Sequence, residues 1–197
     1  MKTNNDRERR YRPSAEFRVE PDSNEKPRMI TGTAVVYDSA SEDLGGFIEI
    51  IKPGTFTASL KTADVRALIN HDLSYPLGRT KYGTLRLLDD DKALRVEIDP
   101  PSTTYVADLI ENIRAKNLAG MSFGFMATEQ EWGRTADGTT LRTITKAEIF
   151  DVSVVSDPAY PETSVALRSL QAWQGQSPNE VQLLKVQLRE KYFRPQS

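Results

Sequence analysis

Apolar and polar residues alternate along much of the chain from Arg28 onward, as in β-strands that bury one face. The alternating stretches, several of them rich in β-branched residues, cover residues 28–39, 45–53, 64–72, 83–99, 118–132 and 141–156. Residues 83–99 predict a hairpin, because two alternating runs flank an acidic turn at residues 89–92. The pattern therefore predicts a mainly β fold.

Shorter parts of the chain carry apolar residues at helical spacing. Phe56 and Leu60 lie four residues apart after a proline, which predicts a short helix. A second stripe, with Ser102 or Thr103 as its cap, consists of Val106, Leu109, Ile110 and Ile113, and a third consists of Val181, Leu184, Leu188 and Tyr192. We expect helices to flank the β-rich core, so that the fold is α+β overall.

Three segments differ in composition. Residues 1–27 are dominated by charge, Asn and Pro and show no periodicity that would bury a face, so they predict a flexible N-terminal arm. Residues 28–170 contain the strands and form the expected folded domain, since a chain of 197 residues with 38% hydrophobic content suits one core. Residues 171–197 predict a linker followed by an amphipathic C-terminal helix.

Charge and residue content exclude several classes of partner. The 26 basic and 28 acidic residues leave a formal net charge of −2, so we expect no nucleic-acid partner. No apolar run approaches the roughly 20 residues of a membrane span, and the N-terminus lacks the apolar core of a signal peptide, so we expect no membrane partner and a cytoplasmic location. With no Cys and one His, we expect neither a metal nor a cofactor.

His71 is the single histidine of the chain, and it stands at the end of the apolar run DVRALINHD. A histidine at such a position is usually a hydrogen-bonded structural residue. Its imidazole can instead act as a general base near neutral pH if a serine hydroxyl lies within hydrogen-bond reach. The role of His71 therefore depends on which residues surround it.

Ser122 is the candidate nucleophile. Strand alternation in AGMSFGF places Ser122 and Gly124 on one face and Phe123 and Phe125 on the other. Gly120 and Gly124 would let a substrate backbone approach the hydroxyl. An ordinary strand serine packed among phenylalanines fits this short motif equally well.

Asp151 is the candidate third residue, 29 positions after Ser122 in the largely apolar run EIFDVSVVS. An ionised carboxylate in such a run needs a partner, and the ring of His71 is a suitable one. The pair would fix the histidine tautomer and stabilise the imidazolium. Glu148 competes for this role, and either carboxylate could equally face solvent.

The chain resembles the prohead maturation proteases of tailed bacteriophages, relatives of the herpesvirus assemblins, from about Met29 to Leu170. The resemblance rests on six segments in order: TGTAVVYDS, FIEIIKPGTF, ALINHDLSYPLGR, GTLRL with its acidic turn, GMSFGF and FDVSVVSDPAYPET. It implies that residues 28–170 are a protease domain with a closed, mostly antiparallel assemblin-like β-barrel.

The resemblance also implies the chemistry. His71 matches the family's general base, Ser122 matches its nucleophile, and Asp151 takes the place of the second histidine of the assemblins. The oxyanion donors are left open between Arg79 and backbone N–H groups near Ser122.

The implied function is a serine endopeptidase in the host cytoplasm, inside the assembling prohead. It would cleave scaffold segments, the N-terminal extension of the major capsid protein and itself, and we expect a homo-oligomer. The alternative is a non-catalytic capsid-assembly or scaffolding module with the same barrel.

Overall fold

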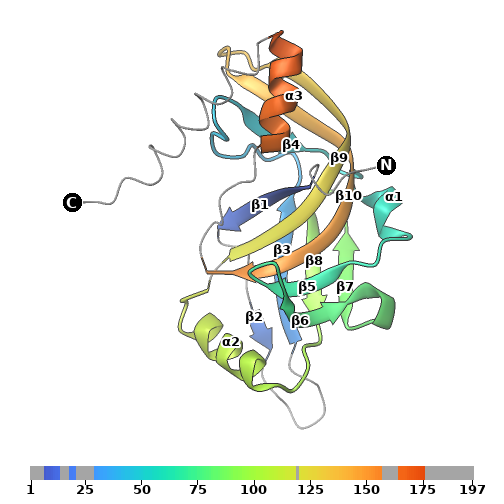
Figure 1. Ribbon diagram of the computed structural model, residues 1–197, viewed down its shortest axis with the longest axis vertical. Coiled ribbons are helices and arrows are strands. Elements are labelled where there is room, and N and C mark those ends of the chain that lie inside the picture. Colours follow the sequence, from blue (N-terminus) through green and yellow to red (C-terminus); the bar gives the residue numbers. More distant parts are fainter. Residues whose placement is uncertain (1–6, 14–17, 21–28, 119, 157–163, 176–197) are drawn as a thin grey trace, which may run out of the picture.

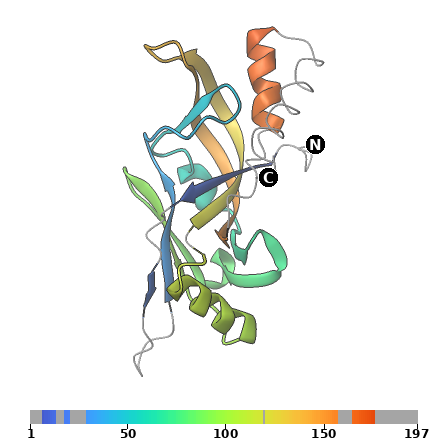
Figure 2. The same ribbon diagram turned by 90° about the vertical axis from the view of Figure 1, so that its left-hand side faces the viewer.

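The structure is a computed structural model that describes residues 7–13, 18–20, 29–118, 120–156 and 164–175. Strands form two sheets that face each other, and the helices lie around their edges (Figures 1 and 2). The chain is therefore mainly β with few helices, as the alternating pattern predicted.

The larger sheet has six strands, and its centre is the long antiparallel hairpin of β9 (Gly120–Arg134) and β10 (Thr140–Val155). β1 (Glu8–Pro13) lies beside β9 at one edge. On its other side β10 pairs with β4 (Ile48–Ile51) and, along another part of its length, with β5 (Arg66–Ile69), and β6 (Asp72–Arg79) lies beyond β5. The smaller sheet contains β2 (Arg18–Glu20), β3 (Met29–Val36), β8 (Ala93–Ile98) and β7 (Leu85–Asp89), in that order. The predicted hairpin at residues 83–99 is the β7–β8 pair.

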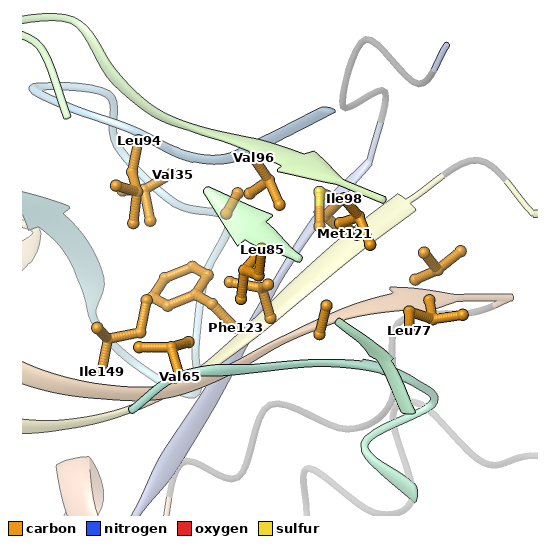
Figure 3. Close-up of a cluster of buried hydrophobic side chains, with 14 of the residues drawn as sticks. Val35, Val65, Leu77, Leu85, Leu94, Val96, Ile98, Met121, Phe123 and Ile149 are labelled. Atoms are coloured by element: carbon orange, nitrogen blue, oxygen red, sulfur yellow. The ribbon is translucent and has the colours of Figure 1, made fainter. Parts of the chain in front are cut away.

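The core lies between the two sheets. Val35, Leu94 and Val96 project from the smaller sheet toward Phe123 and Ile149 of the larger one, and all five are buried (Figure 3). Burying a side chain of this size stabilises the fold by about 1.5–3 kcal/mol relative to leaving it exposed. The predicted face of β9 that carries Phe123 is therefore the core face.

The closed antiparallel barrel that the resemblance implied is not found in the described residues. Hydrogen bonding is divided between two separate sheets, which meet through their apolar faces. Two pairings of β10, with β4 and with β5, are parallel. The sheets thus pack face to face because their inner faces are apolar.

The structure differs from the predicted flexible arm in residues 8–13 and 18–20, which form β1 and β2. β1 pairs antiparallel with β9, and β2 pairs with β3. Periodicity did not reveal β1 because the residues that it buries, Glu8 and Arg10, are charged. The limits 28–170 for the protease domain stay a prediction.

A buried cluster of four charges, which we call the ion cluster, holds β1 in place. Arg10 donates to both oxygens of Glu49, at 2.8 and 2.9 Å, and to Glu8 at 2.7 Å. Arg142 of β10 donates to Glu8 at 2.7 and 2.8 Å and to Glu49 at 2.7 Å. Burial alone would raise the pKa of Glu8, but its hydrogen bonds and its attraction to Arg142 and Arg10 lower it below the ordinary value.

The observed helices agree only in part with those predicted from apolar residues at helical spacing. The short α1 (Thr57–Leu60), the 3-10 helix η2 (Thr80–Tyr82) and α2 (Thr104–Arg114) lie in the middle of the chain, and α2 buries its predicted stripe. Another helix, α3 (Ser164–Gln174), packs Leu167 and Leu170 against Phe47. Because it continues to Gln174, it crosses the boundary that was predicted between the protease domain and the linker at residue 171.

The predicted C-terminal helix along Val181 and Tyr192 lies outside the described residues. No helix of the described ranges has the length and apolar character that crossing a membrane requires.

Candidate active site

His71 lies at the tip of the hairpin that joins β5 to β6. Ile69 pairs with Asp72, so Asn70 and His71 are the two loop residues. Their φ angles are 49° and 59°, the positive values that a tight two-residue hairpin turn of type I′ requires at both positions. Asn and His tolerate this left-handed conformation better than most residues with a side chain.

The hairpin tip is fixed to the neighbouring strand β10. The N–H of Asn70 donates to the carbonyl of Val154 at 3.0 Å, and the N–H of His71 donates to Ser153 Oγ at 3.2 Å. These two bonds set the position of the backbone that carries the imidazole. With the turn held in this position, the imidazole ring lies between Ser122 and Asp151.

Ser122 stands on β9, where it pairs with Ser153 of β10 on one side and with Tyr11 of β1 on the other. Its Oγ lies 2.7 Å from His71 Nε2. The serine residue and the histidine side chain are each only 2% exposed. The two residues thus meet in a covered position, within the distance that proton transfer needs.

Asp151 completes the contact on the other side of the ring, where its Oδ1 is hydrogen-bonded to His71 Nδ1. An irregularity in the β9–β10 ladder between Ile149 and Asp151 brings Asp151 opposite Gly124. A Cβ at Gly124 would collide with the Asp151 carboxylate. The glycine is therefore required for the aspartate to lie against the sheet.

Ser153 is a further residue of the site, which the sequence analysis did not identify. It is fully buried, and its Oγ donates to Asp151 Oδ1 at 3.2 Å while accepting from the N–H of His71. It connects the backbone of the histidine to the carboxylate. Its position two residues after Asp151, on the same face of β10, is the signal that could have revealed it.

Two other residues from the sequence analysis lie apart from this constellation. Arg79 stands at the opposite end of β6 from the His71 turn and binds the Asp64 carboxylate through Nε and Nη2. Glu148 pairs in the ladder with Met126 and, among the described hydrogen bonds of the His71 ring, it makes none.

The expectation that Gly120 and Gly124 leave room for a substrate backbone is wrong for this structure. The ring of Tyr11 fills the space beside Gly120, as the Asp151 carboxylate fills that beside Gly124. Since alternate residues of a strand share a face, Ser122 lies between these two side chains.

This arrangement can carry out one type of chemistry. With the Nδ1–H of His71 directed at a carboxylate, Nε2 is free to accept the hydroxyl proton of Ser122. A serine activated in this way is a nucleophile for acyl transfer. Within the described ranges, no group of three or more acidic, His or Cys side chains could hold a metal ion.

Comparison with known proteins gives two findings. The model of the Caudovirus prohead serine protease family matches residues 15–176. The solved structure of the bacteriophage T4 capsid assembly protease is similar, with a TM-score of 0.50 and 10% sequence identity over 76% of this chain and 98% of that chain. No curated protein sequence matches. At this identity the structural similarity concerns the fold.

Proposed function

Because the chain belongs to the caudovirus prohead serine protease family, we propose that it is an endopeptidase of capsid maturation that uses Ser122, His71 and Asp151 as a catalytic triad. Its substrates are scaffold segments, the N-terminal extension of the major capsid protein and its own chain. The observation that carries the proposal is the continuous contact from Ser122 Oγ through the His71 ring to Asp151.

The first step is nucleophilic attack by Ser122. His71 Nε2, at 2.7 Å, accepts the hydroxyl proton as the oxygen attacks the scissile carbonyl. The same nitrogen then returns the proton to the leaving amine, which yields an acyl-enzyme. A water molecule activated by His71 hydrolyses this ester and regenerates the serine.

Asp151 orients the histidine rather than accepting a proton for itself. Its carboxylate holds Nδ1–H and stabilises the imidazolium that forms when Nε2 takes the serine proton. This contact supports Asp151 over Glu148 as the third residue. A backbone N–H in the segment around Ser122 is the better candidate for the oxyanion donor, since the guanidinium of Arg79 is bound to Asp64.

The work of the enzyme takes place in the host cytoplasm, inside the assembling prohead. Capsid protein and scaffold are its partners there, together with other copies of the chain in a homo-oligomer. Both ends of the chain, residues 1–6 and 176–197, are candidates for self-cleavage. Neither nucleic acid nor membrane is needed for this role.

The test separates cleavage from binding. The purified chain and a Ser122→Ala version are incubated at high concentration, alone and with capsid and scaffold chains, and the masses of all chains are followed by mass spectrometry. Cleavage by the parent chain and none by Ser122→Ala is the expected result. If the parent chain binds capsid subunits and promotes assembly without cutting any of them, the non-catalytic module is the correct function.

A further inference from the structure

A cavity of about 390 Å³ lies beside the proposed catalytic pair. It is lined by Asn70 and Asp72, the immediate neighbours of His71, and by Ile69 and Leu118. Leu118 precedes Ser122 by four residues, which places their Cα atoms at most about 14 Å apart. A peptide held at Ser122 could therefore place one nearby side chain in this cavity.

The walls of the cavity are largely apolar. Ile69, Leu109 and Leu118 supply aliphatic surface, with Tyr75 and Tyr105 beside them. The two tyrosine rings meet edge to face, with their centroids 5.6 Å apart, and the hydroxyl of Tyr105 donates to the carbonyl of Pro76 at 2.7 Å. Tyr75 is exposed, so a substrate side chain can reach the cavity from solvent.

The charge of the cavity has one sign. Asp72 comes from the start of β6 and Asp108 from α2, and none of the described lining residues is basic. Both aspartates are exposed. Asp72 Oδ1 accepts the N–H of Ser74 at 2.8 Å, which orients this carboxylate. The cavity thus joins an apolar wall to a negative rim.

We propose that this cavity is a substrate subsite that binds a Lys or Arg side chain near the scissile bond. The aliphatic stem would lie against the apolar wall, and the charged end would meet the two carboxylates, with the tyrosine rings adding cation–π attraction. An acidic side chain would be repelled, and a purely aliphatic one would leave the carboxylates without a partner. The inference rests on the proposed function, because it concerns the substrate of the same serine.

The experiment determines cleavage preference with a mixture of peptides made by digesting a proteome with another protease. The mixture is incubated with the full chain at high enzyme concentration, and the cut bonds are identified by mass spectrometry. We expect Lys and Arg to be enriched over Leu, Ile and Met at one fixed position relative to the cut bond. Bonds that are also cut in the mixture with Ser122→Ala are background and are subtracted.

Two variants of Asp108 test whether the cavity causes the preference for basic residues. Asp108→Asn should lower the ratio of basic to aliphatic residues at that position about two- to fivefold, because solvent screens the contact of an exposed carboxylate. Asp108→Lys should shift the preference toward Glu and Asp. Because Asp108 is exposed on α2, both variants keep the buried stripe of that helix. Glu111→Gln, an exposed carboxylate on the same helix outside the cavity, is the matched control and should leave the ratio unchanged.

The outcomes distinguish the two proposals. Cleavage without a basic preference at any position, or a preference that both Asp108 variants leave intact, overturns the subsite while the protease function stands. If the parent chain cuts no peptides, as with Ser122→Ala, the subsite is overturned, and the protease function is overturned as well only if capsid and scaffold chains also stay uncut.

Discussion

At the scale of single residues, the site combines positions that sequence motifs reveal with positions that they do not. His71, Ser122 and Asp151 were identified by their match to motifs of the prohead proteases, whereas the surrounding residues alone left a structural role open for each. The role of Gly124 could not be predicted, because it depends on the irregular pairing between Ile149 and Asp151. A local shift in register is set by the whole sheet and leaves no local motif.

Ser122→Ala and His71→Ala should each abolish cleavage of capsid protein, whereas the fold stays intact. Members of a triad act as a unit, so the double variant should be scarcely slower than either single one. The rates are measured by gel densitometry, with circular dichroism as the control for folding. A folded single variant with near-normal cleavage would contradict the assignment.

Asp151→Asn should lose most of the activity, and Glu148→Gln should lose far less. An amide at position 151 cannot stabilise the imidazolium and can select the wrong tautomer of His71. Loss on the order of 10⁴-fold is the effect seen when such a carboxylate is replaced in other serine proteases. The reverse ranking of the two variants would transfer the orienting role to Glu148.

Gly124→Ala should reduce activity much more than it reduces stability. The added methyl group displaces the Asp151 carboxylate from the His71 ring, and the three atoms nearest to it all belong to this flexible side chain rather than to the backbone. Gly133→Ala, on the same strand with open space around it, is the control and should cleave normally. Equal activity of the two variants would show that Asp151 tolerates displacement.

At the scale of elements, β1 shows how far periodicity can mislead. Its inward positions hold Glu8 and Arg10, which satisfy each other and Glu49 and Arg142 in the ion cluster. A search for buried apolar residues overlooks such a strand, because the charges cancel only once three distant segments have come together. By contrast, the apolar stripe of α2 and the alternation of the β7–β8 hairpin are local, and both were predicted correctly.

Glu8→Gln should lower the free energy of unfolding at pH 7 by about 3–5 kcal/mol, because it leaves the two buried guanidinium groups with one carboxylate. The pKa of Glu8 is lowered in the folded state from 4.5, so the stability it adds is present above that pH and is lost as the pH falls below it. The difference from the parent chain, measured by urea unfolding, should therefore shrink in acid.

Glu111→Gln is the control for this measurement, since its carboxylate pairs with Arg114 on the exposed surface of α2. Exposed pairs of this kind contribute about 0–1 kcal/mol. A Glu8→Gln variant as stable as this control at pH 7 would show that the ion cluster adds nothing to the fold.

At the scale of the whole molecule, sequence pattern predicted the class of fold but not how its sheets are arranged. Alternation indicates which face of each strand is buried, yet it is the same for a closed barrel and for two sheets packed face to face. The parallel pairing of β4 and β5 with β10 joins segments far apart in the chain, which no local pattern reports.

The free chain should be a slow enzyme that becomes faster in the presence of assembling capsid and scaffold. Ser122 is 2% exposed, and the ring of Tyr11 lies on the same face of β9. A fluorophosphonate that reacts with activated serines should therefore label the free chain slowly and the assembling mixture faster. Equal labelling rates in both would show that assembly does not control access to the serine.

A version that ends at Gly175 tests whether the C-terminal segment contributes to this control. It keeps α3, whose Leu167 and Leu170 cover Phe47, and removes residues 176–197. We expect it to cleave like the full chain when alone and to gain less from the assembling mixture. An equal gain by both versions would show that the segment has no part in activation.

The β9–β10 hairpin also determines where the chain tolerates a change of length. Ser122 and Asp151 lie at one end of the hairpin, and the connection at residues 135–139 lies at the other. Residues added at that connection would lie beyond the paired strands and leave Ser122 opposite Ser153. Removing one residue from β9 would instead exchange its two faces, turning the serine into the core and Phe123 toward the histidine. Functional variants from a random insertion and deletion library should therefore vary in length at the far connection and keep both strands at constant length.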